Sequence, residues 1–202
     1  MRDTVRRARE LIGSYVIVTD PTGGQCGGRI VETEAYCADD PASHSYRGRT
    51  RRNGSMFRAE GHIYVYRAYG IHWCLNVVTA AAGVGEAVLI RAIEPLWGVE
   101  EMYRRRGIER RHDPRGDAEA TESELDPRLT NGPGKLCQAL RITGEFDGIF
   151  MNDPDGPLRI EPDPSTTIPT EEIQSAPRVG ISKNGEVPWR FFRAGSRFVS
   201  RR

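Results

Sequence analysis

The stretch Arg29-Ile30-Val31-Glu32-Thr33-Glu34-Ala35-Tyr36 is the part of the sequence that says most about fold and chemistry. Its β-branched residues predict a strand over Gly27–Tyr36, and side chains alternate along a strand, so Glu32, Glu34 and Tyr36 share one face. A face packed into a core would carry Val or Ile at those positions. Two interpretations stay open at this point: a solvated strand edge, or a carboxylate held over a substrate as a general base.

Length and charge indicate one domain with an uneven charge distribution. The chain has 202 residues and a net charge of +1, and a chain of this size buries about 70% of its unfolded surface in one core. Between Pro41 and Asn76 there are six arginines and three histidines against one acid, whereas Glu145–Glu172 carries eight acids. This segregation predicts one anion-facing surface. The alternative is that separate loops carry unrelated solvated charges.

Neither a metal centre nor a membrane segment is indicated. The four cysteines show no CxxC spacing and no pairing with histidine at zinc-ligand intervals. No apolar run has membrane-spanning length, and the N-terminus, with five charges in its first nine residues, lacks a signal-peptide core. We expect a cytoplasmic protein, associated with the nucleoid if prokaryotic, without cofactor or metal.

Hydrophobic patterning, Gly and Pro predict a series of short elements. Strands are expected at Tyr15–Val18, Gly27–Tyr36, Ile63–Ala68, Ile71–Thr79, Ala87–Ile93 (ending at Glu94-Pro95) and Arg190–Val199. Helices are expected at Thr4–Leu11, Val99–Arg106 and Lys135–Arg141, a long basic loop at Cys37–Arg58, a surface insertion at His112–Arg128, and an acidic, Pro-rich stretch at Asp153–Ser175. Together they indicate a single mixed α/β domain with much antiparallel sheet.

The two strands around Tyr69-Gly70 predict a hairpin. One face, which includes Ile63, Val65 and Leu75, is expected to pack into the core, whereas the other carries Tyr64, Tyr66, Cys74 and Asn76. Aromatic residues on strands usually serve packing.

Tyr69 stands at the tip of this hairpin. An exposed aromatic ring flanked by Arg67 and His72 suits a wedge that fills the gap left by a rotated nucleotide, with the cations on phosphates. The alternative is a ring packed under a neighbouring loop.

Gly132-Pro133-Gly134-Lys135 is not a nucleoside-triphosphate loop, because Leu129 and Leu136 stand where that motif needs Gly and Ser or Thr. Lys135 at the helix start could hold a DNA phosphate, or the segment could be a Gly-Pro helix entry with a surface lysine.

The sequence resembles the alkyladenine (3-methyladenine) DNA glycosylases of the antiparallel-sheet type. The resemblance spans roughly residues 10 to 200 in the family's order. It rests on VETEAY, on Ala42-Ser43-His44, on the segments Arg52–Phe57, Tyr64–Gly70, Cys74–Asn76, Leu89–Pro95 and Gly132–Leu140, and on PRVG at Pro177–Gly180. It implies an α+β (mixed α/β) fold: a single compact domain over residues 1–202, with a central antiparallel, curved sheet, flanking helices and a protruding β-hairpin.

The resemblance also assigns roles. Glu34 would activate the attacking water, helped by Arg91 and the backbone carbonyl of Val179. The flipped base would lie among Tyr36, His44 and Tyr66, with the backbone N–H of His44 on its edge and Asn76 disfavouring the amino group of guanine. Tyr69 would intercalate. For the DNA backbone we expect contacts from Arg47, Arg52, Arg67 and Lys135.

The implied function is a monofunctional, monomeric DNA glycosylase that flips out and hydrolyses alkylated purines (3-methyladenine, 7-methylguanine type), and deaminated or etheno purines, from double-stranded DNA. Chemistry alone does not choose between Glu32 and Glu34; the resemblance selects Glu34. Lys135 and Lys183 are the only lysines and lie outside the catalytic segments, which favours water over an amine nucleophile. The competing hypotheses are a carbohydrate glycosidase that uses Glu32 with Glu34, and a non-catalytic binder of damaged or bent DNA.

Overall fold

The computed structural model describes residues 2–110, 124–165 and 168–200. Three helices are present in that part of the chain: α1 (Asp3–Glu10), α2 (Val99–Arg106) and α3 (Pro133–Leu140). The strands are β1 (Tyr15–Thr19), β2 (Gln25–Tyr36), β3 (Ile63–Ala68), β4 (His72–Val78), β5 (Ala87–Trp97), β6 (Leu158–Glu161), β7 (Ile173–Ala176) and β8 (Arg190–Arg193). None of the helices in the described ranges is long and apolar enough to cross a membrane.

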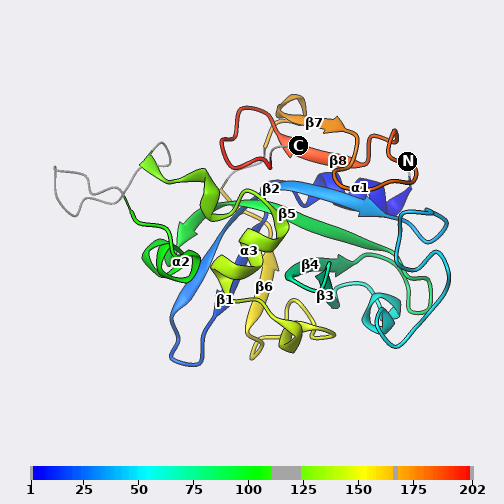
Figure 1. Cartoon of the computed structure of the whole chain (residues 1–202), viewed down its shortest axis with the longest axis horizontal. Helices are drawn as coiled ribbons and strands as arrows, with labels where there is room; N and C mark the ends of the chain where they lie inside the picture. Colours follow the sequence, from blue (N-terminus) through cyan, green and yellow to red (C-terminus); the bar gives the residue numbers. More distant parts are fainter. Residues whose placement is uncertain (1, 111–123, 166–167, 201–202) are drawn as a thin grey trace.

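The strands form one antiparallel sheet with β2 near its centre. The order is β3-β4-β5-β2-β1-β6, and β8 pairs with β2 and with β7. The long strands β2 and β5 run side by side through the middle of the molecule, and β7 and β8 lie above them in Figure 1. The expected α+β fold, with its central antiparallel sheet in a single compact domain, is confirmed.

Two glycines let β2 run close to its neighbours. A Cβ at Gly27 would lie 2.2 Å from the carbonyl oxygen of Val16 on β1, and a Cβ at Gly28 would lie 2.0 Å from that of Glu94 on β5. Only glycine fits such contacts with backbone. The β2–β5 register shifts here and again around Glu32, which is how a β-bulge bends a strand.

The solvated-edge interpretation of β2 is wrong. Both carboxylates, Glu32 and Glu34, are fully buried, together with every other residue from Ile30 to Ala35. The alternation was sound, but β2 is an interior strand covered on both faces, so the carboxylate face needs partners from other elements rather than water.

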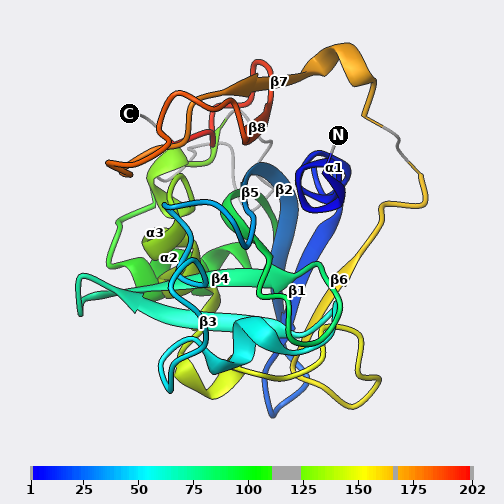
Figure 2. The same ribbon diagram turned by 90° about the vertical axis from the view of Figure 1, so that its right-hand side faces the viewer.

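The core lies between the sheet and the helices. Figure 2 shows α1 on one side of β2 and β5, and α2 and α3 on the other. Thr33 ties β2 to α1, because its hydroxyl donates to the Ala8 carbonyl at 2.6 Å. The hairpin of β3 and β4 packs Ile63, Val65 and Leu75 into this core, as expected, and projects from the body.

Several boundaries differ from expectation. β5 continues through Pro95 to Trp97, which the register shift at Gly27/Gly28 accommodates. β8 ends at Arg193 instead of Val199, and the acidic stretch contains β6 and β7, which were not foreseen. Residues 37–58 are irregular apart from a 3-10 turn at Gly54–Phe57. Most of the expected surface insertion, residues 112–123, lies outside the described residues.

Candidate active site

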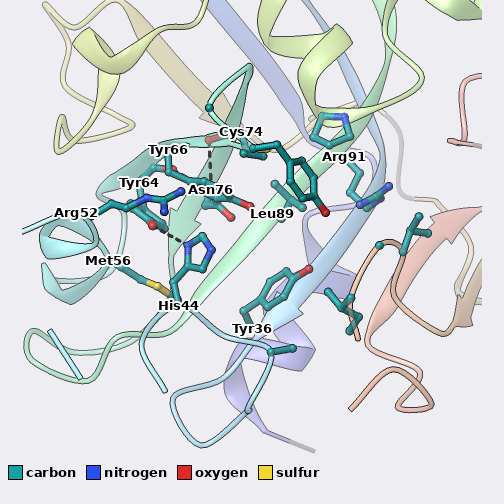
Figure 3. A pocket seen from close by; sticks show the side chains of 18 residues that line it. Tyr36, His44, Arg52, Met56, Tyr64, Tyr66, Cys74, Asn76, Leu89 and Arg91 are labelled. Atoms are coloured by element: carbon teal, nitrogen blue, oxygen red, sulfur yellow. Dashed lines mark hydrogen bonds between the residues drawn. The ribbon is translucent and has the colours of Figure 1, made fainter. Parts of the chain in front are cut away.

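A cavity of about 730 Å³ opens where β2, β5, the hairpin and the loop of residues 37–58 meet. It collects most of the expected site residues from distant parts of the chain, as Figure 3 shows. Its walls include Tyr36, His44, Arg52, Met56, Tyr64, Tyr66, Tyr69, Cys74, Asn76, Leu89, Arg91, Val179 and Ile181. A pocket with aromatic walls and a few convergent polar groups is the usual form of a small-molecule or base site.

Glu34 lies directly behind the cavity wall, fully buried. Its Oε1 accepts the backbone N–H of Val179 at 2.7 Å, and its Oε2 accepts the Tyr36 hydroxyl at 2.8 Å. Arg91 Nη1 lies 3.2 Å from the same Oε2. The expected partners Arg91 and Val179 are therefore both at the carboxylate, although the Val179 contact in the structure is made by the amide and not by the carbonyl.

Tyr36 forms one wall of the cavity. Burial and then the neighbouring Glu34 raise the pKa of its phenol far above the ordinary value. The hydroxyl therefore stays protonated and donates to Glu34, which leaves the carboxylate as the basic member of the pair. Behind the ring lies the guanidinium of Arg178, 4.7 Å from the ring centroid.

Arg178 joins two segments that line the cavity. It forms a buried ion pair with Asp40, from the loop that carries His44, and donates to the Ala35 carbonyl at 2.9 Å. Asp40 also accepts from Asn184 at 3.0 Å. This clasp of Asp40 with Arg178 fixes the residue just before Val179, and hence the amide that meets Glu34.

Glu32 has a different environment from Glu34. It lies away from the cavity and is enclosed by Arg91, Arg190 and Ser200. A pair of carboxylates that flanks a substrate bond, as a carbohydrate glycosidase requires, is therefore not formed by Glu32 and Glu34.

The opposite wall comes from the loop and the hairpin. His44 Nδ1 lies 2.9 Å from the Tyr64 hydroxyl, and the His44 ring packs edge-on against Tyr66 with centroids 4.4 Å apart. Asn53 holds the His44 carbonyl at 2.9 Å. Partial desolvation on this wall, and then the Arg52 cation, lower the pKa of His44, so the ring is neutral at pH 7.

Asn76 lies on the cavity floor, opposite Tyr64 in the β3–β4 ladder. Its Nδ2 donates to the Tyr64 carbonyl at 3.0 Å and to the Cys74 carbonyl at 3.4 Å. These bonds to the hairpin backbone hold the amide in one position, so any group entering the cavity meets a fixed obstacle.

Tyr69 occupies the hairpin tip with its side chain 85% exposed. Its backbone φ is +53°, followed by Gly70 at +72°, and the Ile71 N–H closes the turn onto the Ala68 carbonyl at 3.0 Å. A left-handed conformation is uncommon for tyrosine and points to a functional constraint. The alternative of a ring packed under a neighbouring loop is excluded by this exposure.

Of the four cations expected to contact the DNA backbone, only Arg52 lines the cavity. Arg52 lines the cavity and donates to the Arg67 carbonyl at 2.9 Å. Arg47 is exposed on the same loop, and Arg67 lies over Trp73 at 5.2 Å. Lys135 is not in this cavity: it lines a second depression and donates to Asn131 at 2.7 Å.

Comparison with known proteins decides the family. A family model described as methylpurine-DNA glycosylase matches residues 1–197. The chain belongs to the methylpurine-DNA glycosylase family. It is therefore an N-glycosyl hydrolase that acts on DNA.

Curated relatives are similar in sequence to this methylpurine-DNA glycosylase over nearly its whole length. A protein of Nitrosospira multiformis is 49% identical over 96% of this chain and 87% of its own length. A protein of Granulibacter bethesdensis is 47% identical over 98% of this chain and 83% of its own length. A protein of Methanoculleus marisnigri is 46% identical over 100% of this chain and 95% of its own length. All three are named "Putative 3-methyladenine DNA glycosylase".

Sequence reasoning missed four residues that shape this glycosylase site: Asp40, Arg178, Arg190 and Ser200. Arg178 stands inside the PRVG motif, which was a usable signal. The other three gave no usable signal, because the charged group that each contacts lies more than a hundred residues away along the chain: Arg178 for Asp40, and Glu32 for Arg190 and Ser200.

Proposed function

We propose that this enzyme flips a damaged purine out of duplex DNA into the cavity and hydrolyses its N-glycosidic bond with a water activated by Glu34. The observation that carries the proposal is the position of Glu34, buried behind the cavity wall and held by Tyr36, Val179 and Arg91. The whole chain would act as one glycosylase domain, as a monomer, and in the cytoplasm or on the nucleoid where its DNA is.

One carboxylate suffices for this chemistry. Cleavage of the bond leaves an oxocarbenium-like sugar, which the negative charge of Glu34 stabilises while its oxygen takes the proton of the attacking water. An alkylated base is already cationic and leaves without a second, acidic carboxyl. Burial opposes the charge of Arg91, but Glu34 and Glu32 outweigh it and raise the pKa of Arg91, so this guanidinium remains a fixed cation beside the base.

Selection of the base would come from the aromatic walls and the floor. Tyr36 and Tyr66, with neutral His44, can stack on a cationic purine, since ring faces attract cations. Asn76, held by two backbone carbonyls, would obstruct the amino group of normal guanine. Rotating a base out of the stack costs a few kcal/mol, and least for a damaged pair, which adds selectivity before the pocket is reached. Hypoxanthine and ethenoadenine lack this amino group, and 7-methylguanine carries it but is cationic, so we include all three as candidate substrates besides 3-methyladenine.

The same geometry favours hydrolysis without strand cleavage. A lyase needs an amine that attacks the sugar carbon, and neither lysine of the chain lines the cavity in the described structure. We expect an intact abasic strand as product.

The test is product analysis on duplex oligonucleotides that each carry one lesion: 3-methyladenine, 7-methylguanine, hypoxanthine or ethenoadenine. Chromatography of the free base, and cleavage of the strand by alkali at the abasic site, would report excision. Cleavage of the strand before alkali is added would report lyase activity. Release of at least one methylated base, with no cleavage before alkali, supports the proposal.

Two other outcomes would sink it. Tight, salt-dependent binding of lesion duplexes without any released base would indicate a non-catalytic DNA binder. Strand cleavage before alkali would require an amine nucleophile and would contradict the water mechanism.

A further inference from the structure

Glu32, the second carboxylate of β2, lies at the centre of a buried network that the reaction above does not use. Its Oε1 accepts from Arg190 Nε at 2.5 Å, Ser200 Oγ at 2.8 Å and Arg91 Nε at 3.2 Å, and its Oε2 accepts the Ser200 backbone N–H at 2.7 Å. Glu32 is fully buried, and Arg91, Arg190 and Ser200 are each 5 or 6% exposed.

Ser200 takes part through every polar atom it has. Its hydroxyl donates to Glu32 and accepts from Arg91 Nη2 at 3.1 Å, while its carbonyl accepts from Arg190 Nη2 at 3.2 Å. Ser200 thus closes a ring around Glu32 from a segment that no strand holds. The match to the family model ends at residue 197, before Ser200.

The network leaves Arg91 with little freedom. A guanidinium is planar with five N–H donors in a fixed fork. Arg91 Nε is held by Glu32 and Nη2 by Ser200, so the direction of Nη1, which lies 3.2 Å from Glu34, is fixed as well. The two carboxylates and two guanidinium groups also balance in charge, as a buried cluster of ions requires.

We propose that Glu32 and Ser200 are positioning residues that aim Arg91 at Glu34, so that the C-terminal segment of residues 198–200 sets the rate of base release without touching the DNA. The proposal rests on the proposed role of Glu34. Loss of the Ser200 hydroxyl would leave Arg91 Nη2 without this partner, so that only Glu32 and Glu34 itself would fix the orientation of the guanidinium. A small misplacement of a group in a reacting constellation slows the chemistry more than it weakens binding.

The variant that tests the proposal is Ser200→Ala, which removes the hydroxyl and keeps the backbone bond to Glu32. We expect its single-turnover base release to fall about tenfold, with the affinity for lesion duplex within about twofold of wild type. Ser200→Thr, which keeps a hydroxyl, should recover the rate. Ser196→Ala is the matched control: Ser196 lies in the same tail, and its hydroxyl accepts from the Phe198 N–H and not from the network, so its rate should match wild type.

A second measurement is independent of activity. Thermal unfolding of wild type, Ser200→Ala, Arg91→Lys and the double variant forms a double-mutant cycle. Because the two side chains touch, we expect the change in unfolding free energy of the double variant to differ from the sum of the two single changes. Ser196→Ala combined with Arg91→Lys should be additive.

Wild-type release by Ser200→Ala, or release by Ser200→Thr as slow as that of Ser200→Ala, would overturn the proposal. Additive unfolding effects would also overturn it. If wild type releases no base from any lesion, the proposed function fails, and the cycle still decides whether Ser200 holds Arg91.

Discussion

At the scale of single residues, His44 is the pocket group whose charge changes nearest to neutral pH. Its lowered pKa, caused by desolvation and by Arg52, means that the folded protein binds this proton less tightly than the unfolded chain does. Between the lowered pKa and the ordinary value near 6.5, the unfolded state holds more protons, so the contribution of His44 to stability is lost as the pH falls.

This titration predicts a lesion-dependent pH profile. An imidazolium at His44 would repel a cationic 7-methylguanine but not a neutral hypoxanthine, so the single-turnover rate on the cationic base should drop more steeply from about pH 8 to about pH 5. His44→Gln should remove the difference between the two profiles. Parallel profiles for both lesions in wild type would show that the ring does not meet the base.

Glu32 and Glu34 show how far residue patterns reach. Alternation correctly placed both carboxylates and Tyr36 on one face of β2, but it could not show that the face is buried. The partners that neutralise it, Arg91 and Arg190, come from β5 and β8. A single sequence carries no signal for such pairing, so a solvated edge was the reasonable interpretation until the motifs suggested otherwise.

At the scale of elements, the hairpin was the best predicted unit, because its alternation is regular and its turn carries glycine. The pocket face and the core face of β3 and β4 lie as expected. By contrast, β6 and β7 have only four residues each and lie in Pro-rich sequence. They are strands because they pair with β1 and β8, and local propensity gave no indication of that.

The exposed tip of this hairpin predicts a duplex-specific effect. Tyr69→Ala should lower excision from duplex DNA by about tenfold or more, because the stack then loses a wedge worth about 1–3 kcal/mol. Excision of the same lesion from a single strand should change little, since no gap has to be filled. Tyr46, 52% exposed on the loop, supplies the control Tyr46→Ala. Equal losses on both substrates would contradict the wedge role of Tyr69.

The clasp of Asp40 with Arg178 predicts a stability effect. Asp40→Asn removes the charge that balances buried Arg178 and should lower the free energy of unfolding by about 3 kcal/mol, measured by urea denaturation. Burial opposes ionisation of Asp40, but its bonds to Arg178 and Asn184 lower its pKa. This stabilisation is therefore present above the unfolded pKa and is lost as the pH falls through the lowered one.

Asp3→Asn, which breaks an exposed ion pair with Arg6, is the matched control for the clasp. It should shift the unfolding midpoint only slightly. An equal change in the free energy of unfolding in both variants would show that burial of the clasp does not make it more stabilising than an exposed ion pair.

At the scale of the whole molecule, the cavity and the exposed arginines of residues 47–67 lie on the side of the sheet that ends in β3, whereas β6 is at the opposite end of the strand order. DNA bound across the cavity should therefore release counterions mainly where its phosphates meet the arginines on that side. Arg52→Gln is expected to reduce the slope of log affinity against log salt by about one. Arg159→Gln, on β6, should leave the slope unchanged. An equal salt dependence of affinity in both variants would show that the DNA does not bind preferentially on the side of Arg52.

Activation of the water by Glu34 is tested by comparing binding and base release in the same samples for wild type and Glu34→Gln, on a duplex with one 7-methylguanine. Glutamine keeps the shape of the side chain and an oxygen acceptor, but it cannot take a proton. Glu145→Gln, at an exposed position, controls for loss of a carboxylate. For Glu34→Gln we expect lesion affinity within a fewfold of wild type and release slowed by about 100-fold or more. Release at the wild-type rate by Glu34→Gln would contradict activation of the water by Glu34.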